Sequence, residues 1–204
     1  MNIPRSILRL TVLLPGCLCA SISFAQPDYL GAGMAVAPAA PDAAIAQALQ
    51  SIQPAPIKKT IETLVGFGTR STLSSTEKDL PAGKGINAAA DWIAGQFEQI
   101  GQQCGGCLEV HRDTFTEPVS ERIPQPTTIT NIYAILRGSD PVQAKRMVLV
   151  TGHYDSRNSN VLDTHGDAPG ANDDASGVAV SLECARALSK LHLPATVVFV
   201  AVAG

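Results

Sequence analysis

Residues 147–177, MVLVTGHYDSRNSNVLDTHGDAPGANDDASG, join an apolar run to a polar loop and a helix start, and this stretch decides the fold. Met147–Thr151 is apolar without alternation, so we expect a central strand that is covered on both faces of a largely parallel sheet. A helix from about Ser176 to Lys190 should follow, and Thr196–Ala203 is a second continuous apolar run. The order strand, loop, helix, strand predicts a βαβ unit with a right-handed crossover.

Other elements precede this unit. Apolar residues recur at helical spacing in Ala43–Ile52, in Ile57–Val65 with Gly66 as the stop, and in Ile86–Ile100 with Gly101 as the stop. Residues 108–115 and 131–136 have strand patterns, whereas residues 66–85 read as a polar loop punctuated by glycines. The predicted fold class is α/β, with a mixed, largely parallel central sheet flanked by helices and incomplete at its C-terminus.

Residues 1–25 have the three zones of a secretory signal peptide. Arg5 and Arg9 precede an apolar stretch, and Ser23-Phe24-Ala25 forms a small-x-small cleavage site, so the mature chain should start near Gln26. Pro15 and later polar residues interrupt the segment before it reaches the 18 or so apolar residues of a membrane span. We therefore expect a secreted or periplasmic protein without a membrane span.

A lipoprotein is the alternative, with Cys17 as the lipidated residue. Residues 26–56 form an Ala/Pro-rich lead-in between the signal and the folded part.

The composition is that of a globular protein with a core. Of the 204 residues, 45% are hydrophobic and 16% are charged, and the net charge is −3. After loss of Arg5 and Arg9 with the signal, 13 basic residues face 18 acidic ones, a charge of −5. Because no Lys/Arg-rich run is present, nucleic acid is not expected as a partner.

Three cysteines lie beyond the signal. Cys104 and Cys107 are separated by two glycines, which permit a short-loop disulfide in an oxidising compartment. A zinc knuckle would need a second Cys/His pair, and a thioredoxin-type motif should open a helix, whereas this pair precedes a strand pattern. Cys184 lies on an apolar helix face, which favours an inert buried thiol.

Metal-binding side chains follow the Met147–Thr151 strand. Ligands bind beyond the carboxyl ends of strands in such sheets, and residues two apart on an extended chain point the same way. His153 can thus bind a metal through one ring nitrogen while Asp155 orients the ring. Further on, the segment Gly170–Gly177 carries Asp173, whose carboxylate can bridge two cations about 3.5–4 Å apart.

The segments GHYDS and PGANDDASG resemble the first two metal motifs of the co-catalytic dizinc exopeptidases, a family that includes bacterial leucyl aminopeptidase and is related to glutamate carboxypeptidase. The resemblance implies that His153 is a zinc ligand, that Asp155 is the catalytic-site carboxylate behind it, and that Asp173 bridges the metals and precedes a cis peptide. It also implies two zinc ions per complete domain and hydrolysis of peptide or protein substrates, as an aminopeptidase, by a water held between the ions.

The family pattern requires more than these residues. A Glu-Glu pair containing the general base should come directly after the next strand, followed by another acidic ligand and a second His, all beyond Gly204. We therefore expect residues 57–204 to be the N-terminal part of a zinc peptidase domain that binds zinc weakly and hydrolyses nothing alone. The alternatives are a non-catalytic binding module with the same fold and a glutaminyl cyclase-like enzyme.

The remaining polar residues favour structural roles. His111, His165 and His192 are expected to be structural or solvated, and an EF-hand loop counted from Asp163 would place Ala168 where glycine is required. The sequence contains neither a G-x-S-x-G elbow nor an HExxH helix. Asp174 and Ser176 are suited to capping the following helix.

Overall fold

The computed structural model describes residues 40–203. The predicted signal peptide, residues 1–25, and the alternative lipidation site Cys17 lie outside this part of the chain. None of the helices in residues 40–203 combines the length and the apolar character needed to cross a membrane.

Four strands form one mixed sheet in the order β1-β2-β4-β3. They are β1 (Leu108–Glu117), β2 (Thr127–Leu136), β3 (Met147–His153) and β4 (Thr196–Val202). The β1–β2 and β2–β4 pairs are antiparallel, and β3 runs parallel to β4. The mixed α/β class is confirmed, with parallel pairing confined to β3 and β4 among the described strands.

The position of β3 corrects one expectation. Instead of a central strand, β3 is an edge strand of the described sheet, and Met147, Val148 and Leu149 are 66%, 53% and 60% exposed. The crossover brings β4 between β2 and β3, so β4 becomes the buried strand, with Phe199 fully enclosed. An apolar run shows that a strand can be buried on both faces. The order of strands in the sheet decides which of the two apolar strands, β3 or β4, is buried.

Four α-helices accompany the sheet: α1 (Ala43–Gln50), α2 (Pro54–Gly66), α3 (Gly85–Gln103) and α4 (Ser176–Leu188). Helix α3 continues past Gly101, the predicted stop, and ends at Gln103. Gly101 faces the start of β1. A Cβ atom at Gly101 would lie 3.4 Å from the Cβ of Leu108. Gly101 therefore serves close packing between helix and strand instead of ending the helix.

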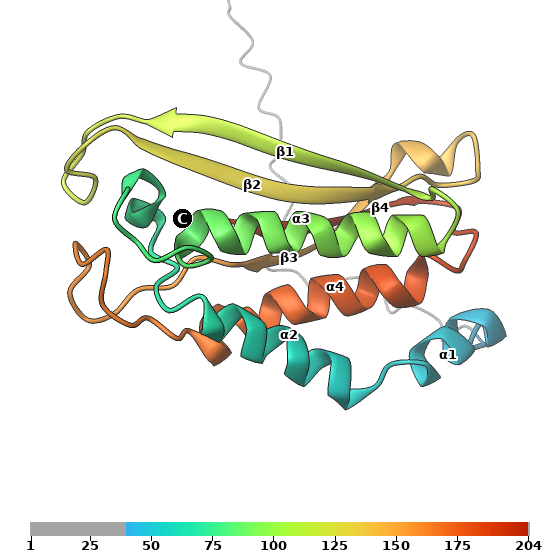
Figure 1. Ribbon diagram of the computed structural model, residues 1–204. Helices are drawn as coiled ribbons and strands as arrows, with labels where there is room; N and C mark the ends of the chain where they lie inside the picture. The colour runs from blue at the N-terminus through green and yellow to red at the C-terminus, as the bar shows by residue number, and fades with distance from the viewer. Residues whose placement is uncertain (1–39, 204) are drawn as a thin grey trace, which may run out of the picture. The chain divides into compact units, whose positions relative to one another are not determined.

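The helices cover the sheet in layers (Figure 1). Helix α3 packs on β1 and β2, α4 packs on β3 and β4, and α2 packs on α4. The interface is apolar and includes the fully buried side chains Leu64, Ile93, Phe97, Ile132, Val178, Leu182 and Phe199.

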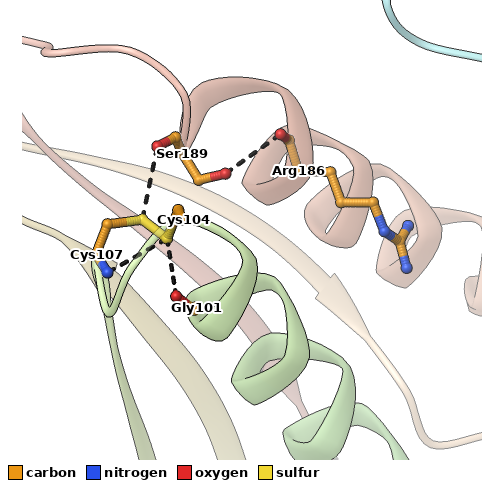
Figure 2. The surroundings of a disulfide bond; sticks show 5 residues. All are labelled: Gly101, Cys104, Cys107, Arg186 and Ser189. Carbon is orange, nitrogen blue, oxygen red and sulfur yellow. Dashed lines mark hydrogen bonds between the residues drawn. A yellow bond between two sulfur atoms is a disulfide. The ribbon is translucent and has the colours of Figure 1, made fainter.

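A disulfide joins the end of α3 to the start of β1 (Figure 2). Cys104 and Cys107 are bonded, as predicted, and the intervening Gly105 and Gly106 both have positive φ, which glycine adopts readily. The Cys107 sulfur lies 3.6 Å from the carbonyl oxygen of Ser189, so the bridge also contacts the end of α4. Cys184 is a free thiol and is half-buried instead of fully buried; burial raises its pKa.

Residues 66–85 differ most from their predicted role as a polar loop. They contain a 3-10 helix, Thr72–Thr76, and part of the segment turns inward. Its buried residues are Thr69, Arg70, Ser71, Leu73 and Ser74. Polar side chains can be buried when their hydrogen bonds are satisfied, and the partners of Arg70 lead directly to the candidate site.

Candidate metal centre

The candidate site lies where the carboxyl end of β3 meets the start of α4. His153 is the last residue of β3, and Gly152 before it allows α4 to approach closely. A Cβ atom at Gly152 would lie 2.3 Å from the carbonyl carbon of Gly177, so any larger residue would push the helix away. In Figure 1 the polar loop after β3, coloured orange, extends from this same end of the sheet.

The three predicted site residues lie together. The Nδ1 atom of His153 is 3.1 Å from Oδ1 of Asp155, and its Nε2 atom is 2.9 Å from Oδ1 of Asp173. The imidazole is thus held between two carboxylates, one on each ring nitrogen. Asp155 is the more enclosed of the two carboxylates, and Asp173 is 88% exposed.

A turn, Ala171–Ala175, carries Asp173 to the histidine. Its Asp173 and Asp174 have non-helical backbone angles and are joined by a cis peptide bond, as the family resemblance implied. Gly170, just before the turn, has a φ of 43°, a left-handed conformation that favours glycine.

Asp174 connects the two halves of the site. One carboxylate oxygen accepts a hydrogen bond from the backbone N–H of His153 at 3.0 Å, and the other accepts from the N–H of Gly177 at 2.8 Å. The second bond pairs an N–H group in the first turn of α4, although the N-cap residue is Ala175 and not Asp174. Ser176 does not cap the helix, because its hydroxyl donates to the carbonyl oxygen of Asn172.

The electrostatic environment favours a cation. Partial burial lowers the pKa of His153, but the carboxylates of Asp155, Asp174 and Asp173 together outweigh burial and leave the pKa raised. The same negative charge that attracts a proton to the ring attracts a metal ion.

The donor set suits zinc. One imidazole nitrogen and one carboxylate oxygen are zinc ligand types, and a second carboxylate on the other ring nitrogen fixes the tautomer. His153 Nε2 and Asp173 Oδ1 would be the ligands, with Asp155 behind the ring. A catalytic zinc normally has three protein ligands, more than these two.

Arg70 was missed by the sequence reasoning. Its side chain is fully buried and lies beneath this site, where it donates hydrogen bonds to four carbonyl oxygens of the backbone. Burial lowers the pKa of Arg70 to about 10, opposed by the nearby Asp155 carboxylate, so the guanidinium remains charged at neutral pH. Nothing in the composition of residues 66–85 marks this arginine as buried.

A second group of metal-ligand types joins the loop between β3 and α4 to the segment that follows the 3-10 helix Thr72–Thr76. Glu77, Asp79 and His165, here called the surface triad, each place one ligand atom within 4.8 Å of the others. His165 was expected to be structural or solvated; its Nε2 lies 2.9 Å from Oδ1 of Asp79, and both side chains are at least half exposed.

The loop that carries His165 is organised by Asp163. One oxygen of this carboxylate accepts from the backbone N–H groups of His165 and Gly166, and the other accepts from the side chain of Asn158. These bonds lower the pKa of Asp163 to about 2. The carboxylate acts as a turn-forming group, in keeping with the exclusion of an EF-hand.

A pocket of about 390 Å³ adjoins Asp155. Its walls come from the 3-10 helix, the β1–β2 connection and the loop after β3. The apolar side chains of Leu73, Ile123, Ile129 and Val161 contribute to the lining, together with polar and charged residues that include Glu117, Arg122 and Arg157. The site therefore combines a charged centre with an adjacent recess that is partly apolar.

Comparisons with known proteins agree with the motifs. Residues 131–204 match the model of peptidase family M28. A probable zinc metalloprotease of Pyricularia oryzae is 43% identical over 187 residues, which cover 91% of this chain and 36% of that protein. One from Pyrenophora teres f. teres is 41% identical over 84% of this chain and 35% of that protein, so the chain spans about a third of the length of these relatives.

Solved structures share the fold. LapB from Legionella pneumophila superposes with a TM-score of 0.54 at 22% identity, covering 80% of this chain and 38% of that chain. The glutaminyl cyclase of Fimbriiglobus ruber gives a TM-score of 0.55 at 20% identity, covering 74% and 45%. The motifs, the family match over residues 131–204 and the relatives agree that this part of the chain is similar to peptidase family M28.

Proposed function

We propose that this chain supplies the first part of the zinc centre of a peptidase. The observation that carries the proposal is the position of the His153 ring, between Asp155 on Nδ1 and Asp173 on Nε2. That arrangement presents one nitrogen to a metal and keeps the other protonated by hydrogen bonding it to a carboxylate.

Each residue then has a distinct role. Nε2 of His153 and the carboxylate of Asp173 would hold zinc, and Asp155 keeps the imidazole in the correct tautomer and orientation. Zinc bound there would polarise a scissile carbonyl as a Lewis acid and would lower the pKa of bound water. Asp174 holds the backbone of His153 against the turn, so that the two ligands start from a fixed separation.

The finer assignment is an aminopeptidase with two zinc ions that acts on peptides after export. The family resemblance of GHYDS and PGANDDASG supports the two ions and the exopeptidase reaction. The zones of residues 1–25 support export, and intact-mass analysis of the exported protein should find Gln26 as the first residue.

The gene sequence beyond codon 204 tests the proposal most directly. Among residues 40–203, only His153 and Asp173 stand as ligands at this centre, and catalysis needs at least one more ligand and a general base. A Glu-Glu pair followed by an acidic residue and a histidine would support the peptidase. A reading frame without these residues would overturn it in favour of a binding module.

An activity assay adds the reaction type. We expect the protein encoded by the whole gene to hydrolyse leucine p-nitroanilide, to lose this activity with a chelator or with H153A, and to leave N-acetyl-leucine p-nitroanilide intact. Hydrolysis of the blocked substrate would contradict the aminopeptidase assignment. Cyclisation of an N-terminal glutamine without hydrolysis would replace the peptidase by a cyclase.

A further inference from the structure

The side chain of Arg70 joins three segments of backbone that are distant in sequence. Its Nε atom donates to the carbonyl oxygen of Tyr154 at 2.7 Å, and Nη1 donates to those of Leu64 at 2.8 Å and Pro169 at 2.9 Å. Its Nη2 atom donates to the carbonyl oxygen of Gly170 at 3.0 Å. The planar guanidinium fork can serve these acceptors at once, which a lysine ammonium cannot.

Two of the three joined segments are the two halves of the candidate metal centre, and the third is Leu64 in α2. Tyr154 lies between His153 and Asp155, and Pro169-Gly170 leads into the turn that carries Asp173. The acceptor Tyr154 is one residue from His153, and the acceptor Gly170 is three residues from Asp173. All four hydrogen bonds of the guanidinium go to backbone carbonyl oxygens, and its charge also interacts with the Asp155 carboxylate, so Arg70 acts on the site through the backbone and through this charge.

Backbone bonds fix Arg70 in place. Its own carbonyl oxygen accepts from the N–H of Ser156 at 3.0 Å, and the N–H of Ala168 donates to the carbonyl oxygen of Gly68 at 3.1 Å. The Ser156 hydroxyl closes the arrangement by donating to the carbonyl oxygen of Ala168 at 2.6 Å. Residues 68–70 are thus bonded to both the strand end and the turn.

The turn packs directly against the guanidinium. A Cβ atom at Gly170 would lie 2.9 Å from Nη2 of Arg70 and 2.5 Å from the carbonyl oxygen of Asp173. A side chain at position 170 would therefore push the turn away from the guanidinium, and the hydrogen bonds to Pro169 and Gly170 oppose such a movement.

We propose that Arg70 is a positioning residue that sets the separation between His153 and Asp173 before any metal binds. This inference rests on the proposed zinc centre for its functional meaning. Its geometric content, that the guanidinium holds the turn against the end of β3, can be measured without metal.

The His153 N–H reports on this geometry, because its acceptor is the Asp174 carboxylate on the other half. We expect R70K to lower the hydrogen-exchange protection of this amide about 10-fold or more while amides in the centres of β2 and α3 keep theirs. The matched control is R137K, because Arg137 bonds the exposed Glu109 at the opposite end of the sheet. Unchanged protection of His153 in R70K would overturn the proposal, and so would an equal loss at every amide.

Zinc affinity gives the second measurement, by calorimetry on the 204-residue chain in an H165A background that disables the surface triad. We expect R70K to weaken zinc binding about 10-fold or more and R137K to leave it unchanged. Unchanged affinity in R70K would overturn the positioning role. If H153A does not alter zinc binding, the proposed centre fails, and hydrogen exchange alone decides the inference.

A folding failure is also informative. Should R70K not fold, R70Q takes its place, because its amide retains hydrogen-bond donors on a neutral side chain. If neither variant folds, Arg70 supports the whole domain instead of the site, and the proposal of a local role is wrong.

Discussion

Within residues 40–203, two histidine–carboxylate clusters share the same close contact but differ in what holds them. His153 Nε2 lies 2.9 Å from Asp173, and His165 Nε2 lies 2.9 Å from Asp79. The backbone around the first pair is bonded to a buried arginine. The second pair belongs to the surface triad, whose loop is organised by the Asp163 turn.

The difference shows that side-chain distance is a poor guide to a metal site. The ring of His153 is oriented by Asp155, a carboxylate that is mostly enclosed. The second nitrogen of His165 faces the hydroxyl of Thr164, which also donates to Glu77. Preorganisation of the ligands lowers the cost of ordering them when the metal binds, so the first cluster should be the stronger zinc site.

Removing the Arg70 guanidinium, which holds the backbone around His153 and Asp173, should have the largest effect of the changes considered. We expect R70A to lower the free energy of unfolding by about 3 to 5 kcal/mol, because four carbonyl oxygens lose a charged donor and a buried space opens. Urea denaturation followed by circular dichroism measures the loss.

The matched variant is R137A, which removes an arginine that bonds Glu109 on the exposed surface. Its loss should be much smaller, since solvent replaces an exposed ion pair readily. Equal losses in the two variants would show that burial of Arg70 adds nothing to stability.

Removing each histidine in turn tests the ranking of the two clusters. H153A should weaken zinc binding by the 204-residue chain about 10-fold or more, whereas H165A should weaken it less than about 3-fold. Isothermal titration calorimetry with zinc provides both values. A larger effect in H165A would reverse the ranking and make the surface triad the main zinc site.

The site residues could be predicted from sequence because their chemistry is local. His153 and Asp155 are two residues apart on an extended chain, and Asp173 sits in a motif whose glycines signal a turn. Arg70 could not be predicted, because its four acceptors are backbone carbonyls, and any residue type at those positions would present the same group. The surface triad was missed because His165 is 86 residues from Asp79 and meets it only in the folded chain.

The fold, too, was predictable where the signal is local and was not predictable where it depends on contacts distant in sequence. The βαβ pattern and the Cys104–Cys107 bridge follow from local spacing, and both are present. The order of strands in the sheet is a long-range property, and the apolar run Met147–Thr151 carried no information on whether β3 or β4 pairs with β2. Sequence periodicity predicts what an element can bury, whereas partners are set by the whole chain.

Altering the side chain that contacts Nδ1 of each ring, Asp155 for His153 and Thr164 for His165, should have a smaller effect on zinc affinity. D155N keeps the shape of the side chain but removes the charge that orients His153, and we expect zinc affinity to fall about 10-fold. T164A alters the corresponding contact of His165 and should leave zinc affinity within about 2-fold. Equal zinc affinity in D155N and the unaltered chain would remove Asp155 from its predicted role.

The smallest expected effect is on the protonation of His165. Hydrogen bonding to Asp79 raises the pKa of His165 above its ordinary value of 6.5, and the same bond lowers the pKa of Asp79 below 3.8. The raised pKa of His165 stabilises the fold fully below pH 6.5, and this contribution is lost as the pH rises through the raised value. The contribution of Asp79 is present above 3.8 and is lost as the pH falls through its lowered pKa. The pair therefore stabilises the loop most between these two ordinary values, and only slightly, because both groups are exposed.

Proton NMR titration should show the pKa of His165 falling toward 6.5 in D79N and unchanged in D113N, a substitution of an exposed carboxylate on β1. A pKa of His165 that is the same in D79N and the unaltered chain would mean that the contact does not persist in solution, and the surface triad would then differ from the His153 cluster in existence and not only in strength.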